Sequence, residues 1–245
     1  MAHFQQQKFV EAVRAAFPEF FTSCKVLEIG SWNVTGTVRK FFENCEYLGV
    51  DVAAGPCVDL VASGDSLALP SDSFDVVVSC ECFEHNPFWL GTFLNMTRML
   101  RAGGLCLVTC AGIGRGEHGT TRTSPGVSLT SSGPHAEYYR NLSQRDFESQ
   151  IDLALYFSDN AFFDNRYSKD LYFVGIKRSR SRDPRAAGGI AELRDAARRI
   201  RLDKPVTLVR AISAHAEWLL KRSASRLVGE KAYHDIRHLV RPRKL

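Results

Sequence analysis

Two acidic residues lie at positions where a parallel sheet binds its ligand. Asp51 closes an apolar segment at residues 47–52, 23 residues after Glu28, and Asp65 lies in the turn at residues 63–67. A carboxylate at the end of the second strand of a parallel sheet is placed to accept hydrogen bonds from two ribose hydroxyls. Asp65 is placed to accept a hydrogen bond from the exocyclic amine of a purine. This spacing predicts a nucleoside site.

The segment at residues 30–36 predicts a turn that brings backbone close to a ligand. Gly30 and Gly36 permit that approach, and we expect a helix from about Thr37, whose free amides would favour a carboxylate or phosphate. The spacing is not G-x-G-x-x-G, because Trp32 occupies the middle glycine position, and no Gly-Lys-Ser/Thr follows. Both departures count against a dinucleotide or a nucleoside triphosphate.

Histidines are the candidates for a general base. His85 follows an apolar segment, whereas His118 and His135 lie in residues 112–140, which are rich in Gly, Ser, Thr and His. An imidazole titrates near neutral pH, so it can take a proton from an attacking group. Alternatively, His85 fixes its loop, and His118 and His135 are surface residues.

The seven cysteines carry no metal-binding signature. No CxxC pair and no CxxC…HxxxH spacing occurs, so the sequence predicts neither a disulfide framework nor a metal site. The first residues lack the basic and apolar regions of a secretory signal, and no run of eighteen apolar residues occurs. These features predict a cytoplasmic protein with reduced cysteines.

Apolar segments alternate with helical segments along residues 1–177. A helix is expected at residues 5–16, and continuous apolar runs indicate strands that are buried on both faces. The alternation predicts an α/β, Rossmann-like, doubly wound and mostly parallel sheet, with an antiparallel last strand because few residues join the closing pair. The expected strands are residues 25–29, 47–52, 74–79, 105–110, 153–157 and 171–176.

Charge divides the chain in two. Residues 1–177 carry 14 Lys/Arg against 20 Asp/Glu, a net −6, whereas residues 178–245 carry 18 against 7, a net +11. We expect a domain over residues 1–177, a linker over 178–189, and a basic region of two or three amphipathic helices over 190–245. That region has three interpretations: an appendage packed on the domain or on a second subunit, a contact with an anionic membrane surface, or a contact with nucleic acid.

Residues 25–110 resemble the core of the class I S-adenosylmethionine-dependent methyltransferases. The carrying motifs are Asp65-Ser-Leu-Ala-Leu-Pro-Ser-Asp-Ser-Phe-Asp75, Glu84-His85 and Arg98-Met-Leu-Arg-Ala-Gly-Gly104. The resemblance covers roughly 150 residues when the closing strands are included, and it leaves the basic region uncovered. The sequence departs from the family at Trp32-Asn33-Val34, where many members have Gly-x-Gly.

The resemblance implies S-adenosylmethionine as the cofactor. It implies that Glu28, Gly30, Ser31 and Gly36 form the turn around the methionine part of the cofactor. It implies that Asp51, with Val52, holds the ribose and that Asp65 and Ser66 flank the adenine. Cys80 and Glu81 are the residues implied beside the sulfonium.

Together these features predict a methyltransferase that acts on an oxygen or nitrogen of a small molecule, with His85 and His118 as its catalytic candidates. The small polar residues of segment 112–140 suggest a sugar or a glycoconjugate precursor as the acceptor. Two alternatives stay open. One is a non-catalytic binding protein that keeps the fold and docks through its basic region, and the other is an RNA or protein methyltransferase guided by that region.

Overall fold

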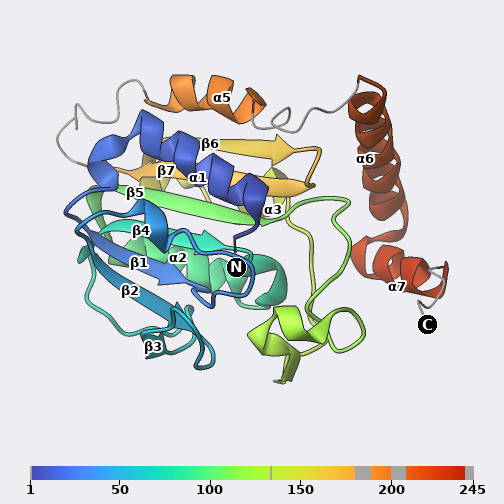
Figure 1. Ribbon diagram of the computed structural model, residues 1–245, viewed down its shortest axis with the longest axis horizontal. Coiled ribbons are helices and arrows are strands. Elements are labelled where there is room, and N and C mark those ends of the chain that lie inside the picture. Colours follow the sequence, from blue (N-terminus) through green and yellow to red (C-terminus); the bar gives the residue numbers. More distant parts are fainter. Residues whose placement is uncertain (1, 133, 180–188, 200–207, 241–245) are drawn as a thin grey trace.

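The computed structural model describes residues 2–132, 134–179, 189–199 and 208–240. Seven strands form one sheet in the order β3-β2-β1-β4-β5-β7-β6 (Figure 1). The strands are β1 (Lys25–Ile29), β2 (Glu46–Asp51), β3 (Leu60–Val61), β4 (Phe74–Cys80), β5 (Leu100–Ala111), β6 (Phe157–Asn165) and β7 (Asp170–Lys177). The helices are α1 (Phe4–Ala16), α2 (Trp89–Met99), α3 (Gln144–Glu148), α4 (Leu153–Tyr156), α5 (Gly189–Arg199), α6 (Leu208–Val228) and α7 (Glu230–Val240).

The sheet is parallel except at β7, which runs antiparallel to both β5 and β6. Only residues 166–169 connect β6 to β7, and a parallel pair would need a crossover of a dozen or more residues. The predicted Rossmann-like class with an antiparallel last strand is therefore confirmed.

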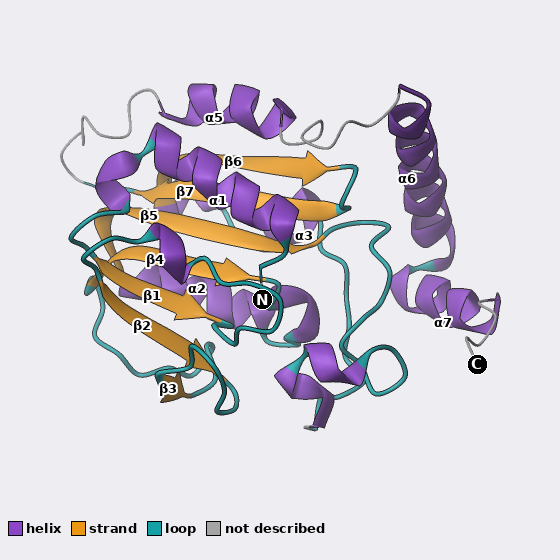
Figure 2. Cartoon of the chain, viewed as in Figure 1, coloured by secondary structure: helices purple, strands orange, loops and turns teal. Residues whose placement is uncertain are grey.

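Both faces of the sheet are buried, as the continuous apolar strands predict. Successive side chains of a strand point to opposite faces, so Val76 and Val78 pack toward α1 while Val77 packs toward α2. Phe9 of α1 and Phe93 of α2 have no exposed surface and cover the two sides. Figure 2 shows the sheet with helices on either side of it.

The helix expected from Thr37 is wrong, because only a short 3-10 turn at Arg39–Phe41 follows β1. The irregular turn at residues 30–38 takes up most of the connection, so only residues 39–45 remain before β2, too few for a full helix. Helix α1 contacts this segment instead: the Lys40 ammonium donates to Gln7 Oε1 at 2.6 Å, and the Ala2 amide donates to the Gly36 carbonyl at 3.1 Å. The first helix of the chain covers the face that a helix after β1 would cover.

The strand expected at residues 153–157 is also wrong for all but its last residue. Residues Leu153–Tyr156 form α4, because the Asp152 carboxylate accepts a hydrogen bond from the Ala154 amide at 3.1 Å and caps the helix. Strand β6 begins at Phe157. The two-residue strand β3 escaped prediction, since both of its side chains are exposed and give no buried pattern.

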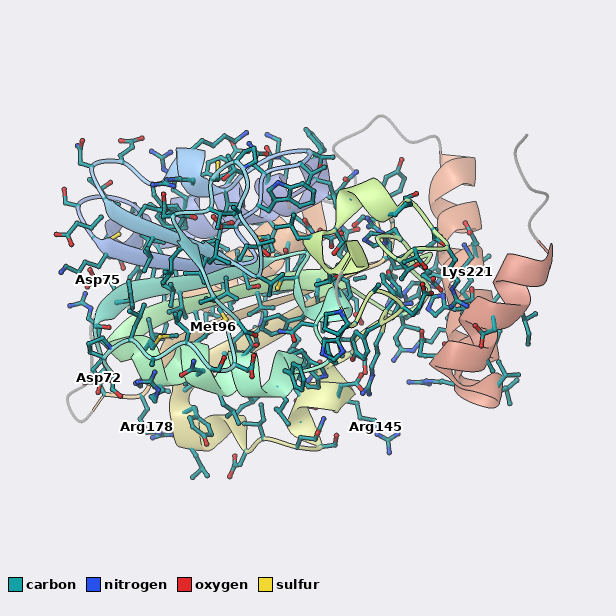
Figure 3. All side chains as sticks on the ribbon, turned by 90° about the horizontal axis from the view of Figure 1, so that it is seen from below. Asp72, Asp75, Met96, Arg145, Arg178 and Lys221 are labelled. Atoms are coloured by element: carbon teal, nitrogen blue, oxygen red, sulfur yellow. The ribbon has the colours of Figure 1, made fainter. Side chains whose placement is uncertain are left out.

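The C-terminal region is helical, as expected, and α5 is part of the core. Ile190 and Leu193 of α5 are buried in the same cluster as Phe9. Helices α6 and α7 lie on the side where the parallel strands end (Figure 1), and Lys221 of α6 is far from Asp72 and Asp75 at the start of β4 (Figure 3). The predicted linker falls largely on residues 180–188, outside the described residues. Among the helices that the structure describes, none is both long and apolar enough to cross a membrane.

We expect Leu193→Ala to destabilise the whole domain by about 2–4 kcal/mol, because it opens a cavity in the core beside α1. Urea unfolding followed by tryptophan fluorescence measures this free energy. Leu227→Ala is the matched control: Leu227 is 86% exposed on α6, so its truncation should change stability by less than about 0.5 kcal/mol. Equal effects from both variants would show that α5 does not belong to the core.

Candidate functional site

A cavity opens where β1, β2 and β4 end. The cavity has a volume of about 120 Å³ and is partly open to solvent. Its floor comes from Ile29, Gly30 and Cys82, and its far wall comes from the segment after β5. That wall consists of Val127, Ser128, Leu129, Thr130 and His135.

Gly30 lets the turn after β1 lie against the turn after β4. Its φ is +81°, and a Cβ at this position would lie 2.5 Å from the Cβ of Cys82. Any other residue would strain the backbone and push the two turns apart. The glycine therefore fixes the floor of the cavity.

Asp51 is held at the cavity wall by two backbone amides. Its carboxylate accepts hydrogen bonds from the Trp32 amide at 3.0 Å and from the Val52 amide at 2.8 Å. Burial raises the pKa of Asp51, and these two amides partly offset that rise. Trp32 also lines the cavity and packs on Gly55, where a Cβ would lie 2.4 Å from its ring.

The structure brings four of the predicted cofactor residues to the cavity: Gly30, Asp51, Val52 and Glu81. The other six lie outside its lining, although Asp65 accepts a hydrogen bond from the hydroxyl of Ser63, which does line it. The roles of these six stay predictions. They are Glu28, Ser31, Gly36, Asp65, Ser66 and Cys80.

Glu28 is buried on the face of the sheet that α1 covers. Its carboxylate accepts a hydrogen bond from the Tyr47 hydroxyl at 2.8 Å. Burial raises the pKa of Glu28 to about 7. This buried carboxyl group lies in β1, just before the turn at residues 30–36.

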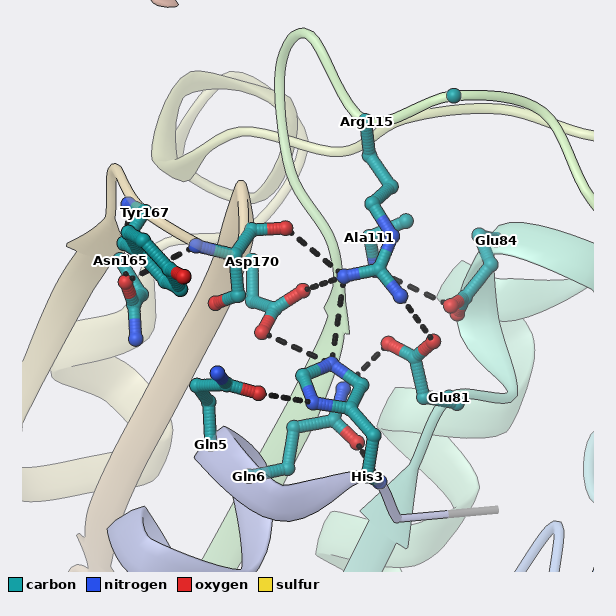
Figure 4. Close-up of polar contacts among 12 residues, drawn as sticks. His3, Gln5, Gln6, Glu81, Glu84, Ala111, Arg115, Asn165, Tyr167 and Asp170 are labelled. Carbon is teal, nitrogen blue, oxygen red and sulfur yellow. Dashed lines mark hydrogen bonds and ion pairs between the residues drawn. The ribbon is translucent and has the colours of Figure 1, made fainter. Parts of the chain in front are cut away.

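Glu81 is the centre of a charged network at the end of β4 (Figure 4). Its carboxylate accepts a hydrogen bond from the Gln6 amide, and it lies 3.5 Å from both Arg115 Nη2 and His118 Nε2. Burial alone would raise the pKa of Glu81, but His118 and Arg115 hold it well below its usual range. Glu81 therefore carries a negative charge at the cavity.

Asp170 anchors the other side of this network. Its carboxylate contacts Arg115 Nη1 at 2.7 Å and His3 Nε2 at 3.1 Å, and it accepts a hydrogen bond from the Tyr172 hydroxyl at 3.1 Å (Figure 4). Burial would lower the pKa of His3, but Asp170 raises it above the ordinary value. Arg115 thus bridges two buried carboxylates.

Sequence reasoning missed His3, Gln6, Arg115 and Asp170. They come from the start of α1 and its N-cap, from the segment after β5 and from the start of β7, so no local spacing links them. The one available signal was the run of charged residues from Arg115 to His118 inside a segment of small residues.

The two predicted catalytic histidines lie together. The rings of His85 and His118 have centroids 5.0 Å apart and are nearly perpendicular, and Tyr139 packs edge-on against both. Burial lowers the pKa of His85 to about 3, with the nearby His118 adding to the effect, so its imidazole is neutral. His85 lines the cavity, and His135 lies at the opposite rim against Phe88.

Helix α7 braces the segment that carries His118. Arg122 forms ion pairs with Glu117 at 2.7 Å and with Asp235 of α7 at 2.8 Å. The ring of Tyr139 packs against His234 of α7 with centroids 5.3 Å apart. The C-terminal region therefore contacts the candidate site through two independent contacts.

One family model matches part of the chain. Residues 27–108 match the family model described as methyltransferase domain. No curated protein matches the sequence.

Several solved structures are similar to this chain. The chain is similar to 1,6-didemethyltoxoflavin-N1-methyltransferase of Burkholderia thailandensis, with 14% identity over 70% of this chain and 79% of that chain (TM-score 0.47). It is also similar to phosphoethanolamine N-methyltransferase 2 of Haemonchus contortus, with 17% identity over 89% and 49% of the two chains (TM-score 0.46). A third similar structure is a Bacillus halodurans protein assigned as a methyltransferase, with 9% identity over 70% of this chain and 99% of that chain (TM-score 0.48).

We expect Glu28→Gln to flatten the loss of stability between pH 5 and pH 8. The pKa of this carboxyl group is about 7 in the folded state and near 4.5 when unfolded, so its penalty grows as pH rises through that window. Removing the charge should recover about 2–3 kcal/mol at pH 8 and much less at pH 5. Urea unfolding at both pH values measures this difference, and Glu11→Gln on the exposed side of α1 is the control. The same pH dependence in Glu28→Gln and the unaltered protein would contradict the assignment.

Proposed function

We propose that this chain, whose residues 27–108 form a class I S-adenosylmethionine-dependent methyltransferase domain, methylates an oxygen or nitrogen of a small polar molecule. The observation that carries the proposal is the cavity itself. Asp51 and Val52 stand on one wall, and His85 and the segment after β5 stand on the other. A cofactor and a small acceptor would then share this cavity.

The residues at the cavity fit S-adenosylmethionine. Asp51 would hold the ribose hydroxyls, and the apolar Ile29 and Ala62 would contact the adenine. The ionised carboxylate of Glu81 would face the positive end of the cofactor. When bound, the cofactor supplies a methyl group on a positively charged sulfur.

The acceptor side is polar. Ser128 and Thr130 place hydroxyl groups at the wall, and their oxygens are 2.7 Å apart. Such groups recognise a molecule that carries several hydroxyls, which supports a sugar or a glycoconjugate precursor as the acceptor. Phe88, 49% exposed at the rim, adds one apolar surface.

The chain's own residues would act mainly by positioning. Methyl transfer needs the acceptor atom in line with the breaking bond, and correct orientation of two reactants supplies roughly 7–11 kcal/mol of the barrier. The segment carrying Val127 to Thr130 would exclude water from the reacting atoms. His85 and His118 would bind the acceptor group or hold its proton on the side away from Asp51.

Two interpretations of the basic C-terminal region stay predictions: contact with an anionic membrane surface and contact with nucleic acid. A cytoplasmic location also stays a prediction. Residues 178–245 carry a net +11, and Leu219, Leu220 and Leu227 are exposed on α6. A basic helix with exposed leucines favours the membrane surface over nucleic acid.

We expect Asp51→Ala to weaken the binding of S-adenosylmethionine about 10–100-fold, because two ribose hydroxyls lose their acceptor. Isothermal titration calorimetry of the full chain measures this change. Asp72→Ala is the control, since Asp72 lies at the opposite end of β4 from the cavity (Figure 3). Unchanged affinity in Asp51→Ala, with binding intact in the control, would place the ribose elsewhere.

We expect the enzyme to label small molecules rather than polymers. The full chain is incubated with methyl-labelled S-adenosylmethionine and a cell extract, and the products are separated by size. Label in the small-molecule fraction, with a product heavier by the mass of one CH₂ group, is the expected result. Label confined to the RNA or protein fraction would favour a macromolecular acceptor, and no label in any fraction would favour the non-catalytic alternative.

A further inference from the structure

Buried ligand-type side chains converge beside the proposed acceptor position. Glu81 and the 3-10 turn Phe83–His85 follow β4, and His118 comes from the segment after β5. One ligand atom from each of Glu84, His85 and His118 lies within 4.8 Å of those of the other two. Glu81 is adjacent, with its Oε2 3.5 Å from His118 Nε2.

Several atoms of this cluster are buried without a partner. Glu84 has no exposed surface; its Oε1 accepts a hydrogen bond from the Ala111 amide at 3.1 Å, and burial together with the neighbouring Glu81 carboxylate raises the pKa of Glu84 well above its usual value. Both ring nitrogens of His85 are buried and form no hydrogen bond in the part of the chain that the structure describes. Buried polar atoms are normally hydrogen-bonded, and leaving one without a partner costs about 1–3 kcal/mol.

We propose that Glu84, His85 and His118 bind a divalent transition-metal cation. Two imidazoles with one carboxylate are a donor set that transition metals such as zinc and iron use in proteins. Ligand atoms that share such an ion at about 2.1 Å lie about 3–4 Å apart, so small rotations of these side chains complete the site. A positive ion also offsets the repulsion between the neighbouring buried carboxylates of Glu81 and Glu84.

The lid, residues 112–140, orients the two histidines for metal binding. The Nδ1 of His118 lies 3.0 Å from the Gly116 carbonyl, and donation there leaves Nε2 as a ligand atom. Gly119 has φ +65°, and a Cβ on it would lie 2.7 Å from His85 Cε1, so glycine lets the chain pass close over that ring. Both features orient the imidazole rings of the cluster.

A second group of possible ligands, His3, Glu81 and Asp170, is a poor alternative. The guanidinium of Arg115 lies 2.7 Å from Asp170 and 3.5 Å from Glu81, so the positive charge that these acids require is already present (Figure 4). A cation there would be repelled by Arg115. Glu84, in contrast, forms no ion pair with a guanidinium or an ammonium among the described residues.

The position of the site would let the bound ion act on the acceptor. His85 and Glu81 both line the cavity, so a vacant coordination position would face the acceptor. A metal ion lowers the pKa of an oxygen bound to it, which allows a hydroxyl group to attack without a separate strong base. This role rests on the proposed function, whereas the binding of the ion does not.

The test measures metal binding directly on the full chain. The protein is stripped with a chelator, dialysed, and titrated separately with ZnCl₂ and MnCl₂ by calorimetry, with electron paramagnetic resonance for manganese. We expect one ion per chain, and we expect Glu84→Gln and His118→Asn each to weaken its binding at least about 10–100-fold. His135→Asn is the matched control: it removes a histidine from the same cavity but not from the cluster, so it should bind the ion like the unaltered protein.

Two results would overturn the proposal: no stoichiometric binding of either ion to the unaltered protein, or equal binding in the Glu84→Gln and His118→Asn variants. If Glu84→Gln does not fold, His118→Asn on the lid carries the test alone, with thermal unfolding as the check on its fold. Asp51→Ala separates this result from the proposed function. It should lose cofactor affinity and keep the metal, whereas His118→Asn should lose the metal and keep cofactor affinity.

Discussion

The ion pairs that hold Glu81 and Asp170 against Arg115 are the constraint on which the site depends. Arg115 lies between two carboxylates that are almost fully buried, and removing one member would leave a charge without compensation in a low-dielectric interior. The network joins the end of β4, the segment after β5, the start of β7 and the first turn of α1. Because Gln6 and His3 complete it, the first helix of the chain is part of the wall behind the candidate site.

A second set of contacts links the site to the C-terminal region. Tyr139 touches His85 and His118 on one side and His234 of α7 on the other, while Arg122 pairs with Asp235. A segment as long as residues 112–140 would be mobile without such braces. Helix α7 therefore limits the positions that the lid can adopt, and any partner that moves α7 would also move the ring of His118.

Much of the sheet could be predicted because most of its strands are short continuous apolar runs bounded by turn signals. The placement of Asp51 and His85 at the cavity followed, since parallel strands bring their carboxyl ends to one edge. The missing helix after β1 could not be read in the same way, because residues 37–45 have helix-compatible composition and only the short return to β2 forbids it. The Arg115 network joins residues up to 167 positions apart, from His3 to Asp170, and the local sequence holds no trace of such pairing.

The position of α1 has a consequence for how the chain folds. Phe9 stacks on Tyr172 with ring centroids 4.4 Å apart, and it also contacts Phe163. Strands β1, β4 and β5 supply part of the cluster that buries α1, but β6 and β7 follow α1 by more than 140 residues. Until they are made, the apolar side of α1 is only partly covered, and such long-range closure slows folding and exposes apolar surface to chaperones. The burial of α1 is therefore complete only when the β6–β7 hairpin has formed.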